Sequence, residues 1–334
     1  MKRTITSMIL IFLAFNCFAN STAQPIVANP FMGMWGLEIE GGGAGWLKVH
    51  EEQGFLDAEL LWIGGSVVPV ANVYLMDENT LVVTRTNQVK RSAERSHTIT
   101  YTLEVKKVGD ALLGTMSSPN RDGSGVSIKN FTGKRMPPMP DTPDLSKLKF
   151  EKPIKLFNGK DLSGWKLIDP KKANGFKVVD GTLMNDPVQP EDGEHISYGN
   201  IRTLQDFNDF NLKLEVMVPE GNNSGVYLRG LYEIQVVDSY GKELDSHNMG
   251  ALYSRITPSE AAEKPAGEWQ SFDITLVDRH VTVIFNGKKI IDNQPVWGPT
   301  GGAMSSDVLS PGPIYLQGDH GNVAYRNIVL TPIK

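Results

Sequence analysis

The runs Gly225-Val226-Tyr227-Leu228-Arg229 and Glu233-Ile234-Gln235-Val236-Val237 alternate apolar with polar residues, and Gly230-Leu231-Tyr232 separates them. Side chains alternate between the two faces of a β-strand, so the two runs predict a hairpin with one apolar and one polar face. The apolar face would carry Val226, Leu228, Ile234 and Val236. The polar face would carry Tyr227, Arg229, Glu233 and Gln235.

If Gly230-Leu231-Tyr232 forms the turn, Arg229 lies opposite Glu233 and Tyr227 lies opposite Gln235. Two interpretations of this polar face remain open. A solvated sheet face with an ordinary Arg–Glu pair would add only fractions of a kcal/mol to stability. Alternatively, the guanidinium, amide, phenol and carboxylate form the floor of a groove that binds sugar hydroxyl and carbonyl groups.

Composition extends the β prediction to the whole chain. The 334 residues include 33 Gly and 20 Pro, which imply many turns, and the runs between them alternate rather than repeat with helical spacing. The length suggests two domains with their own cores. With 33 Lys and Arg against 38 Asp and Glu, the net charge of −5 argues against a nucleic-acid binder or a peripheral membrane protein.

The segment Met136-Pro137-Pro138-Met139-Pro140-Asp141-Thr142-Pro143 holds four prolines in eight residues and predicts a stiff linker over residues 136–150. Before it, residues 24–135 predict a small antiparallel β-sandwich or barrel of about eight strands, including one over residues 67–75. After it, residues 151–334 predict a larger β-sandwich with one polar, helix-compatible insertion around residues 258–264.

Two glycine-containing segments predict turns. Gly41 to Gly45 predict a hairpin loop, because a phosphate-binding loop would need a following helix and none is predicted there. Asn286-Gly287 predicts a two-residue hairpin.

The first residues are typical of a secretory signal peptide. Basic residues precede the apolar run 8–15, and Ser21-Thr22-Ala23 fits a cleavage site, so residues 1–23 would be removed. The single Cys17 lies in this leader, so the mature chain would have no disulfide. The apolar run is too short to span a bilayer, so we expect no transmembrane segment after cleavage. We expect a periplasmic protein, with a lipoprotein as the weaker alternative.

The C-terminal part also resembles a known family over nearly all of residues 154–333. The motifs that carry the resemblance are Leu156-Phe157-Asn158-Gly159-Lys160-Asp161-Leu162-Ser163-Gly164-Trp165, Asn223-Ser224-Gly225-Val226-Tyr227, Gly250-Ala251-Leu252-Tyr253, Gly267-Glu268-Trp269, and Gly312-Pro313-Ile314-Tyr315-Leu316-Gln317-Gly318-Asp319-His320-Gly321. In this order they resemble the 3-keto-disaccharide hydrolase family, whose fold is the concanavalin A-like jelly roll. The resemblance does not reach the N-terminal domain.

The resemblance implies cleavage of glycosides that a separate oxidoreductase has already oxidised to a ketone at C3. That ketone acidifies the C2 hydrogen, so a base can form an enolate, the C1 substituent can leave by elimination, and water can then add. The route needs one base, a donor for the enolate oxygen and an acid near the leaving group. It does not need two carboxylates flanking the anomeric carbon.

For these roles we predict Glu233 as the base, with Arg229 or His320 stabilising the enolate. An adjacent arginine would keep Glu233 ionised. His320 is a rival for either role because its ordinary pKa lies near neutral pH, although it could equally be a turn residue. His247 could lie at the rim of a groove, bind a metal, or simply lie in a loop. Residues predicted to bind substrate are Tyr227, Gln235, Asp238, Tyr253, Gln317 and Asp319; Gln317 would join the polar face if Ile314 and Leu316 point inward.

Other functions remain alternatives. Glu233-x-Gln235-x-x-Asp238 resembles the Glu-x-Asp-x-x-Glu strand of retaining glucanases, but Gln235 replaces the middle carboxylate and Asp238 has the wrong strand parity. A conventional retaining hydrolase is therefore disfavoured. A non-catalytic carbohydrate-binding or scaffold protein is the second alternative, because jelly rolls host both. No spacing matches a zinc or calcium motif, so the sequence requires no cofactor while leaving a divalent metal open.

Overall fold

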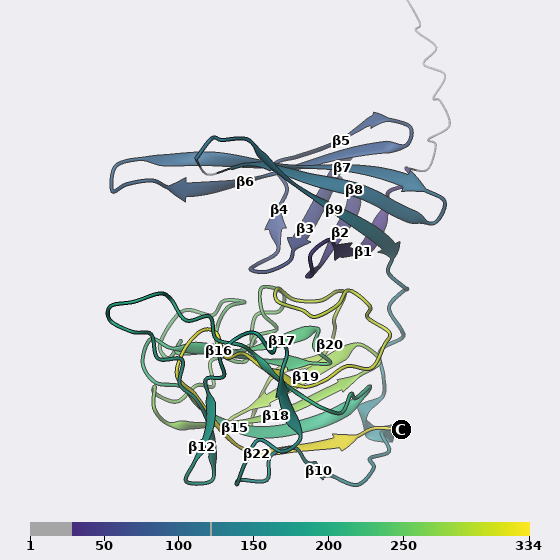
Figure 1. Cartoon of the computed structure of the whole chain (residues 1–334). Helices are drawn as coiled ribbons and strands as arrows, with labels where there is room; N and C mark the ends of the chain where they lie inside the picture. The colour runs from purple at the N-terminus through teal and green to yellow at the C-terminus, as the bar shows by residue number, and fades with distance from the viewer. Residues whose placement is uncertain (1–28, 121) are drawn as a thin grey trace, which may run out of the picture. The chain divides into compact units, whose positions relative to one another are not determined.

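The structure is a computed structural model that describes residues 29–120 and 122–334 (Figure 1). The predicted signal peptide, with Cys17, lies outside these residues. The described part is built of antiparallel strands in three sheets, and its one assigned helix is the 3-10 turn η1, Leu145–Lys147. This confirms the all-β prediction. Within the described ranges, no helix is long and apolar enough to cross a membrane.

The N-terminal part forms one nine-stranded sheet with the order β4-β3-β2-β1-β9-β8-β7-β6-β5. Its strands are β1 (Gly33–Ile39), β2 (Ala44–Glu52), β3 (Phe55–Trp62), β4 (Val68–Pro69), β5 (Asn72–Asp77), β6 (Thr80–Lys90), β7 (Ser96–Val108), β8 (Ala111–Pro119) and β9 (Val126–Arg135). Alternate residues such as Trp35, Leu47, Leu60 and Leu103 form its core. Because β5 contacts β3 as well as β6, the sheet curls around this core.

Two local predictions for this sheet have opposite outcomes. The glycines after β1 form a hairpin turn to β2, with Glu38 opposite Ala44, as expected. The single strand expected over residues 67–75 is wrong, because β4 and β5 are separate strands at opposite ends of the sheet order. Pro69 has no N–H to donate to a continuing ladder, and the chain leaves the sheet directly after it.

The C-terminal part is a sandwich of two antiparallel sheets. The larger sheet has the order β12-β13-β22-β15-β18-β19-β20 with β10 beside β22, and the smaller has the order β11-β14-β21-β16-β17. Their strands are β10 (Ile154–Lys155), β11 (Trp165–Leu167), β12 (Phe176–Val179), β13 (Thr182–Asn185), β14 (Ile201–Thr203), β15 (Phe210–Met217), β16 (Asn223–Leu228), β17 (Tyr232–Val237), β18 (Trp269–Val277), β19 (His280–Phe285), β20 (Lys288–Pro295), β21 (Tyr315–Leu316) and β22 (Val323–Pro332).

The core of this sandwich lies between the inner faces of its two sheets. Leu212, Leu214, Ile274 and Val283 of the larger sheet are buried with Val226, Ile234 and Leu316 of the smaller one. Consequently, the alternate residues of β16, β17 and β21 point to the other face of the smaller sheet. That face carries the candidate site.

The insertion around residues 258–264, whose sequence is compatible with a helix, forms none, and the segment is irregular. Pro258 and Pro265 bracket it, which leaves too few residues to stabilise an isolated helix and disfavours helical backbone at Lys264. Its polar groups bond elsewhere: the N–H of Ser259 donates to the carbonyl of Ile290 at 2.8 Å, and Glu263 accepts from the hydroxyl of Ser239.

The predicted hairpin at Asn286-Gly287 is confirmed. Phe285 and Lys288 pair across the turn, and Asn286 and Gly287 have φ values of 47° and 82°. Two successive positive φ angles are those of the turn that best fits the twist of a two-residue hairpin.

Candidate active site

The outer face of the five-stranded sheet forms the floor of a pocket with a volume of about 580 Å³. Its volume is within the range of small-molecule sites, about 300–1,000 Å³. The side chains that line it include Asn200, Asn223, Tyr227, Glu233, Gln235, His247, Tyr253, Tyr315, Gln317, Asp319 and His320. Seven of the nine predicted site residues are in this set: Tyr227, Glu233, Gln235, Tyr253, Gln317, Asp319 and His320.

Strand alternation explains why these side chains meet. Val226, Leu228, Ile234 and Val236 are buried in the sandwich core, as predicted, which turns Tyr227, Glu233 and Gln235 into the pocket. Ile314 and Leu316 point inward in the same way, so Tyr315 and Gln317 join the pocket from the neighbouring strand. The polar face is therefore the floor of a cavity and not a solvated surface.

The register of the hairpin differs from the prediction. Tyr227 lies opposite Glu233, and Leu228 lies opposite Tyr232, so the loop is Arg229-Gly230-Leu231. Arg229 and Gly230 both adopt positive φ, 55° and 65°, and Leu231 is buried in the core. An arginine gives no signal for the left-handed region, which is why the turn was placed one residue too late.

Arg229 therefore does not reach the pocket, and its predicted role in stabilising an enolate is wrong. Its side chain is buried, and its Nη2 donates to the carbonyl oxygens of Val308 and Ser310. The guanidinium holds the loop around residues 308–310 against the end of the hairpin. Arg229 is a structural residue in this fold.

Asp238 is the second prediction that the structure does not support. It follows the last residue of β17, and its carboxylate accepts from the N–H of Gly221 at 2.9 Å. This contact fastens the turn before β16 and lies outside the pocket lining. The carboxylates that do line the pocket belong to Glu233 and Asp319.

Glu233 is 4% exposed, and burial raises its pKa to about 8. A hydrogen bond from Tyr227 and the charge of His320 act in the opposite direction, but burial outweighs them. The expectation that an adjacent arginine keeps Glu233 ionised is wrong, since Arg229 bonds elsewhere. Glu233 is thus a stronger base than an ordinary carboxylate when it is ionised.

The hydroxyl of Tyr227 has one hydrogen and three polar neighbours. It lies 2.8 Å from Oε2 of Glu233, 2.6 Å from the carbonyl oxygen of Gly301 and 3.1 Å from the side-chain nitrogen of Gln317. The side-chain nitrogen of Gln317 can only donate, and the carbonyl oxygen of Gly301 can only accept. Tyr227 can therefore donate to Glu233 when it is ionised, and can accept from protonated Glu233 while donating to Gly301. Both protonation states of Glu233 have a hydrogen-bond partner.

Two further features hold these groups in place. The rings of Tyr227 and Tyr315 are stacked with centroids 3.8 Å apart, and the hydroxyl of Tyr315 donates to the carbonyl of Gly302 at 2.8 Å. A Cβ at Gly225 would lie 2.4 Å from Oε1 of Glu233. Glycine at this strand position leaves room for the carboxylate.

His320 and Asp319 form a pair at the mouth of the pocket. Nδ1 of His320 lies 2.7 Å from Oδ1 of Asp319, and this hydrogen bond raises the pKa of His320. Partial burial acts against the rise, while the charges of Asp319 and Glu233 add to it. The imidazole therefore favours its protonated form, with Nε2–H as a donor for a ligand.

Sequence reasoning missed several lining residues. Asn223 has the same strand parity as Gly225 and Tyr227, so alternation could have identified it. Asn200, Asn248 and Lys242 come from loops, and Gly64 and Gly65 come from the N-terminal sheet. His247, for which a groove rim and a plain loop were both open, lines the pocket.

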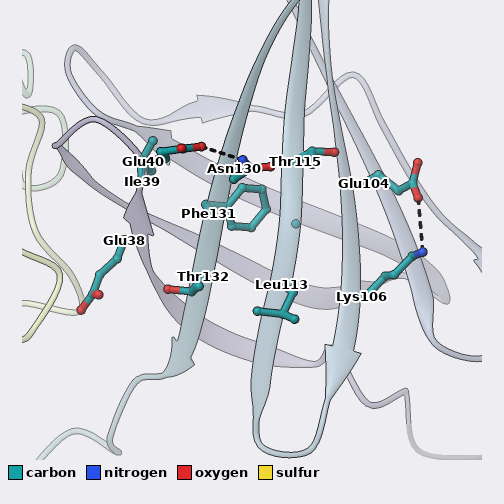
Figure 2. Close-up of a pocket in the computed structure, with 11 residues that line it drawn as sticks. Glu38, Ile39, Glu40, Glu104, Lys106, Leu113, Thr115, Asn130, Phe131 and Thr132 are labelled. Carbon is teal, nitrogen blue, oxygen red and sulfur yellow. Dashed lines mark hydrogen bonds and ion pairs between the residues drawn. The ribbon is translucent and has the colours of Figure 1, made fainter.

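The N-terminal sheet has a separate pocket of about 610 Å³ over β1, β7, β8 and β9 (Figure 2). Its polar groups bond mainly to one another: Asn130 donates to Glu40 at 2.6 Å, and Lys106 lies 4.0 Å from Glu104 (Figure 2). Phe131 is buried beneath it.

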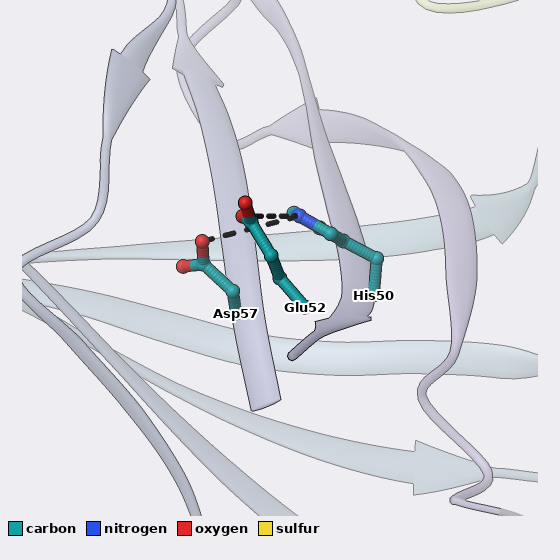
Figure 3. Close-up of side chains that lie close together, drawn as sticks. All are labelled: His50, Glu52 and Asp57. Carbon is teal, nitrogen blue, oxygen red and sulfur yellow. Dashed lines mark ion pairs between the residues drawn. The ribbon is translucent and has the colours of Figure 1, made fainter. Parts of the chain in front are cut away.

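His50, Glu52 and Asp57 lie together on the β2–β3 hairpin (Figure 3). Nε2 of His50 is 4.0 Å from Glu52 and 3.9 Å from Asp57, and the three ligand atoms lie within 4.8 Å of one another. Exposed acidic groups often lie together without an ion, so this arrangement does not by itself require one. In the described residues 29–120 and 122–334, His50, Glu52 and Asp57 are the group of side chains close enough together to hold a metal ion.

Comparison with solved structures found two candidate glycosyl hydrolases from Parabacteroides distasonis ATCC 8503. One is 29% identical, covering 59% of this chain and 93% of its own, with a TM-score of 0.44. The other is 22% identical, covering 55% and 94%, with a TM-score of 0.45. A carbohydrate-binding module from Bacillus subtilis is 13% identical, covering 49% and 93%, with a TM-score of 0.31.

Comparison with curated proteins found no match. The model of the 3-keto-alpha-glucoside-1,2-lyase-like domain matches residues 152–331, which are more than half of the chain and include both sheets of the sandwich with the pocket built on them. The resemblance seen in the motifs is confirmed, and the chain belongs to the family of 3-keto-alpha-glucoside-1,2-lyase-like domains, whose members act on carbohydrates.

Proposed function

We propose that this protein is an exported enzyme that cleaves the glycosidic bond of 3-keto-glycosides by proton abstraction from C2, elimination and hydration. The observation that carries the proposal is Glu233: a buried carboxyl group in a polar pocket, with its pKa raised to about 8. Carbon acids need a stronger base than an exposed carboxylate, and removal from water provides it.

In the first step, ionised Glu233 takes the C2 hydrogen. The electrons of the C–H bond form the C2–C3 double bond of an enolate, and negative charge develops on the former ketone oxygen. Tyr227 donates to Glu233 before the transfer and accepts from it afterwards, by turning its hydroxyl hydrogen toward Gly301. The base therefore keeps a hydrogen-bond partner throughout the step.

His320 is the donor for the developing enolate oxygen. Asp319 holds its Nδ1 side and favours the imidazolium form, so Nε2–H is free to face the substrate. Its charge is close enough to Glu233 to influence the pKa of that carboxyl group. A positive donor aimed at developing negative charge is a strong contribution to such a reaction.

In the second step, the C1–oxygen bond breaks, the enolate electrons form a C1–C2 double bond, and the leaving oxygen takes up the proton held by Glu233. Water then adds across the double bond to give the free 3-keto sugar. The amides of Gln235 and Gln317 and the hydroxyl of Tyr253 provide directional contacts for the sugar. Glu233 carries out both proton transfers of the elimination, and no redox change occurs within the sequence of steps.

We further propose that the protein works in the periplasm, after a separate sugar 3-oxidoreductase has formed the ketone. The N-terminal sequence supports export, with its basic start, its short apolar run and its small-residue cleavage site. The route itself requires the oxidised substrate, because the C2 hydrogen of an ordinary glycoside is not acidic.

The test is to incubate the purified mature protein with a 3-keto-glucoside and with its unoxidised parent. Cleavage of the oxidised glucoside alone is expected. Cleavage of the parent alone would favour a conventional glycoside hydrolase. Tight binding of unmodified glycans, measured by calorimetry and with no product from either compound, would favour a carbohydrate-binding protein instead.

A further inference from the structure

The loop between β3 and β4, residues 63–67, touches the wall of the Glu233 pocket. The N–H of Gly302 donates to the carbonyl of Ile63 at 2.9 Å, and a Cβ at Gly301 would lie only 2.1 Å from the carbonyl oxygen of Gly65. The two backbones are in direct contact, and glycine at position 301 permits it. Gly64 and Gly65 thereby line the same pocket as Glu233.

Ser66, the next residue in this loop, contacts His247, which also lines the pocket. Its Oγ lies 2.8 Å from Nε2 of His247, whose Nδ1 lies 2.5 Å from Oδ1 of Asp245. A carboxylate only accepts, so Nδ1 carries a hydrogen in its bond to Asp245, and Nε2 is the ring nitrogen that bonds to Ser66. Both ring nitrogens of His247 are therefore fixed.

The contact extends to a second ring. Oγ of Ser66 is 3.5 Å from the hydroxyl of Tyr253, and the rings of Tyr253 and His247 meet edge to face with centroids 5.0 Å apart. The adjacent N–H of Val67 donates to Oγ of Ser254 at 3.0 Å, which fastens the loop at its far end. Both rings line the pocket, whereas Ser66 is not among its lining residues.

We propose that the N-terminal sheet is part of the sugar-binding site. Gly64 and Gly65 form one wall of the pocket, and Ser66 is a positioning residue that fixes His247 and Tyr253 against the bound glycoside. The inference rests on the proposed function. The family model does not cover the N-terminal sheet. The inference gives this sheet a role in determining which glycosides the pocket accepts.

The chain of Ser66, His247 and Asp245 has the same order of contacts as a Ser-His-Asp triad. We assign it to positioning and not to nucleophilic attack, because Ser66 is not among the residues that line the pocket. Incubation with a fluorophosphonate probe distinguishes the two. No labelling of Ser66 is expected, and stoichiometric labelling would overturn the positioning role.

Two variants of Gly64, one with a small and one with a large side chain, test whether this residue forms a wall of the pocket. A Cβ there would meet nothing within 4 Å, and the backbone is not in the left-handed region, so the backbone at this position accepts a side chain. Gly64→Ala should leave KM for a 3-keto-glucoside within about twofold, whereas Gly64→Trp should raise it about tenfold or more by filling the pocket. Equal KM values for the two variants, both with wild-type melting temperatures, would contradict the inference.

The role of Ser66 is tested by removing its hydroxyl group and by restoring that group on a different side chain. Ser66→Ala should raise KM about three- to tenfold with kcat nearly unchanged, and Ser66→Thr, which keeps the hydroxyl, should restore KM. An unchanged KM in Ser66→Ala would contradict the positioning role, as would a failure of threonine to restore it in a folded protein.

A second readout does not depend on activity. In ¹⁵N-edited NMR spectra, the Nε2 resonance of His247 should shift toward that of an unbonded nitrogen in Ser66→Ala and not in Ser66→Thr. Identical spectra for all three proteins would show that the contact does not exist. If wild-type protein cleaves no 3-keto-glucoside, the proposed function fails, while the NMR comparison still decides whether the N-terminal sheet holds this ring.

Discussion

Tyr227 and Glu233 are directly opposed residues of the β16–β17 hairpin, and the tyrosine hydroxyl lies 2.8 Å from the glutamate carboxylate inside a buried polar pocket. The same hydroxyl lies 2.6 Å from the carbonyl of Gly301. One hydrogen cannot serve both acceptors at once, so the protonation state of Glu233 decides where it points. This coupling makes the pair sensitive to pH.

Glu233→Gln should abolish at least 99% of turnover with 3-keto-glucosides, because an amide cannot take the C2 proton. Glutamine fits the same space and can still bond to Tyr227, so folding should be preserved. The measurement is the rate of sugar release, with circular dichroism as the control for folding. Wild-type rates in this variant would assign the base to another residue, and His320→Ala would then be tested.

The same variant should change the pH dependence of stability. Since burial raises the pKa of Glu233 from 4.5 to about 8, the folded state binds more protons than the unfolded state between these values. The stabilising contribution of protonated Glu233 is complete below pH 4.5 and is lost as the pH rises through 8. Glu233→Gln should therefore exceed wild type in unfolding free energy at pH 9 by roughly 2–4 kcal/mol, with a smaller difference at pH 5. Parallel unfolding curves at the two pH values would contradict the raised pKa.

The pH profile of kcat/KM should be bell-shaped: it should rise as Glu233 ionises near pH 8, and it should fall again as His320 loses the proton that it offers to the enolate oxygen. Below that pH, the rate should fall about tenfold per unit. Rates measured in overlapping buffers at constant ionic strength test this expectation. A profile that is flat from pH 5 to 8 would mean that the group responsible has an ordinary carboxyl pKa.

Asp319→Asn should lower kcat by about tenfold or more and leave the melting temperature nearly unchanged. The carboxylate of Asp319 raises the pKa of His320 through its hydrogen bond, and an amide would remove most of that effect. The imidazole would then lose its proton at lower pH and be a weaker donor to the enolate. Asp141→Asn, an exposed position in the linker, is the matched control. Equal rates for both variants would exclude His320 as the charged donor.

Strand alternation was sufficient to predict most of the pocket floor. Val226 and Ile234 had to be buried, so Tyr227 and Glu233 had to face the other way, whatever the register. The all-β class followed from the same alternation and from the many turn residues. The prediction failed at Arg229, because the left-handed backbone there depends on the packing of Leu231 and not on the arginine itself.

The residues on the pocket rim could not be found in this way. His247 and Gly64 are far apart in the sequence and meet only because two loops touch. Periodicity describes which face of a strand a residue occupies, but it contains no information about where a loop packs. The raised pKa of Glu233 has the same origin, since it depends on burial by chain segments that the hairpin sequence does not specify.

Gly225→Ala should reduce kcat/KM about ten- to a hundredfold, because its Cβ would lie 2.4 Å from Oε1 of Glu233 and must displace the carboxylate. A double-mutant cycle with Glu233→Ala tests this cause. In the Glu233→Ala background, the alanine at position 225 should cost little further stability, since nothing remains for it to displace. Additive losses of stability would instead indicate a general disturbance of β16.

Variants of Arg229 distinguish a structural role for this residue from the catalytic role that the sequence predicted. Its buried Nη2 holds the carbonyls of Val308 and Ser310, so Arg229→Ala should lose roughly 2–4 kcal/mol of unfolding free energy. Arg229→Gly removes the same hydrogen bonds but tolerates φ of 55°, so it should lose about 1 kcal/mol less than alanine. At 25 °C, both folded variants should keep kcat/KM within about threefold of wild type. A loss of a hundredfold or more in kcat with unchanged KM would return Arg229 to the catalytic role that its position in the sequence first indicated.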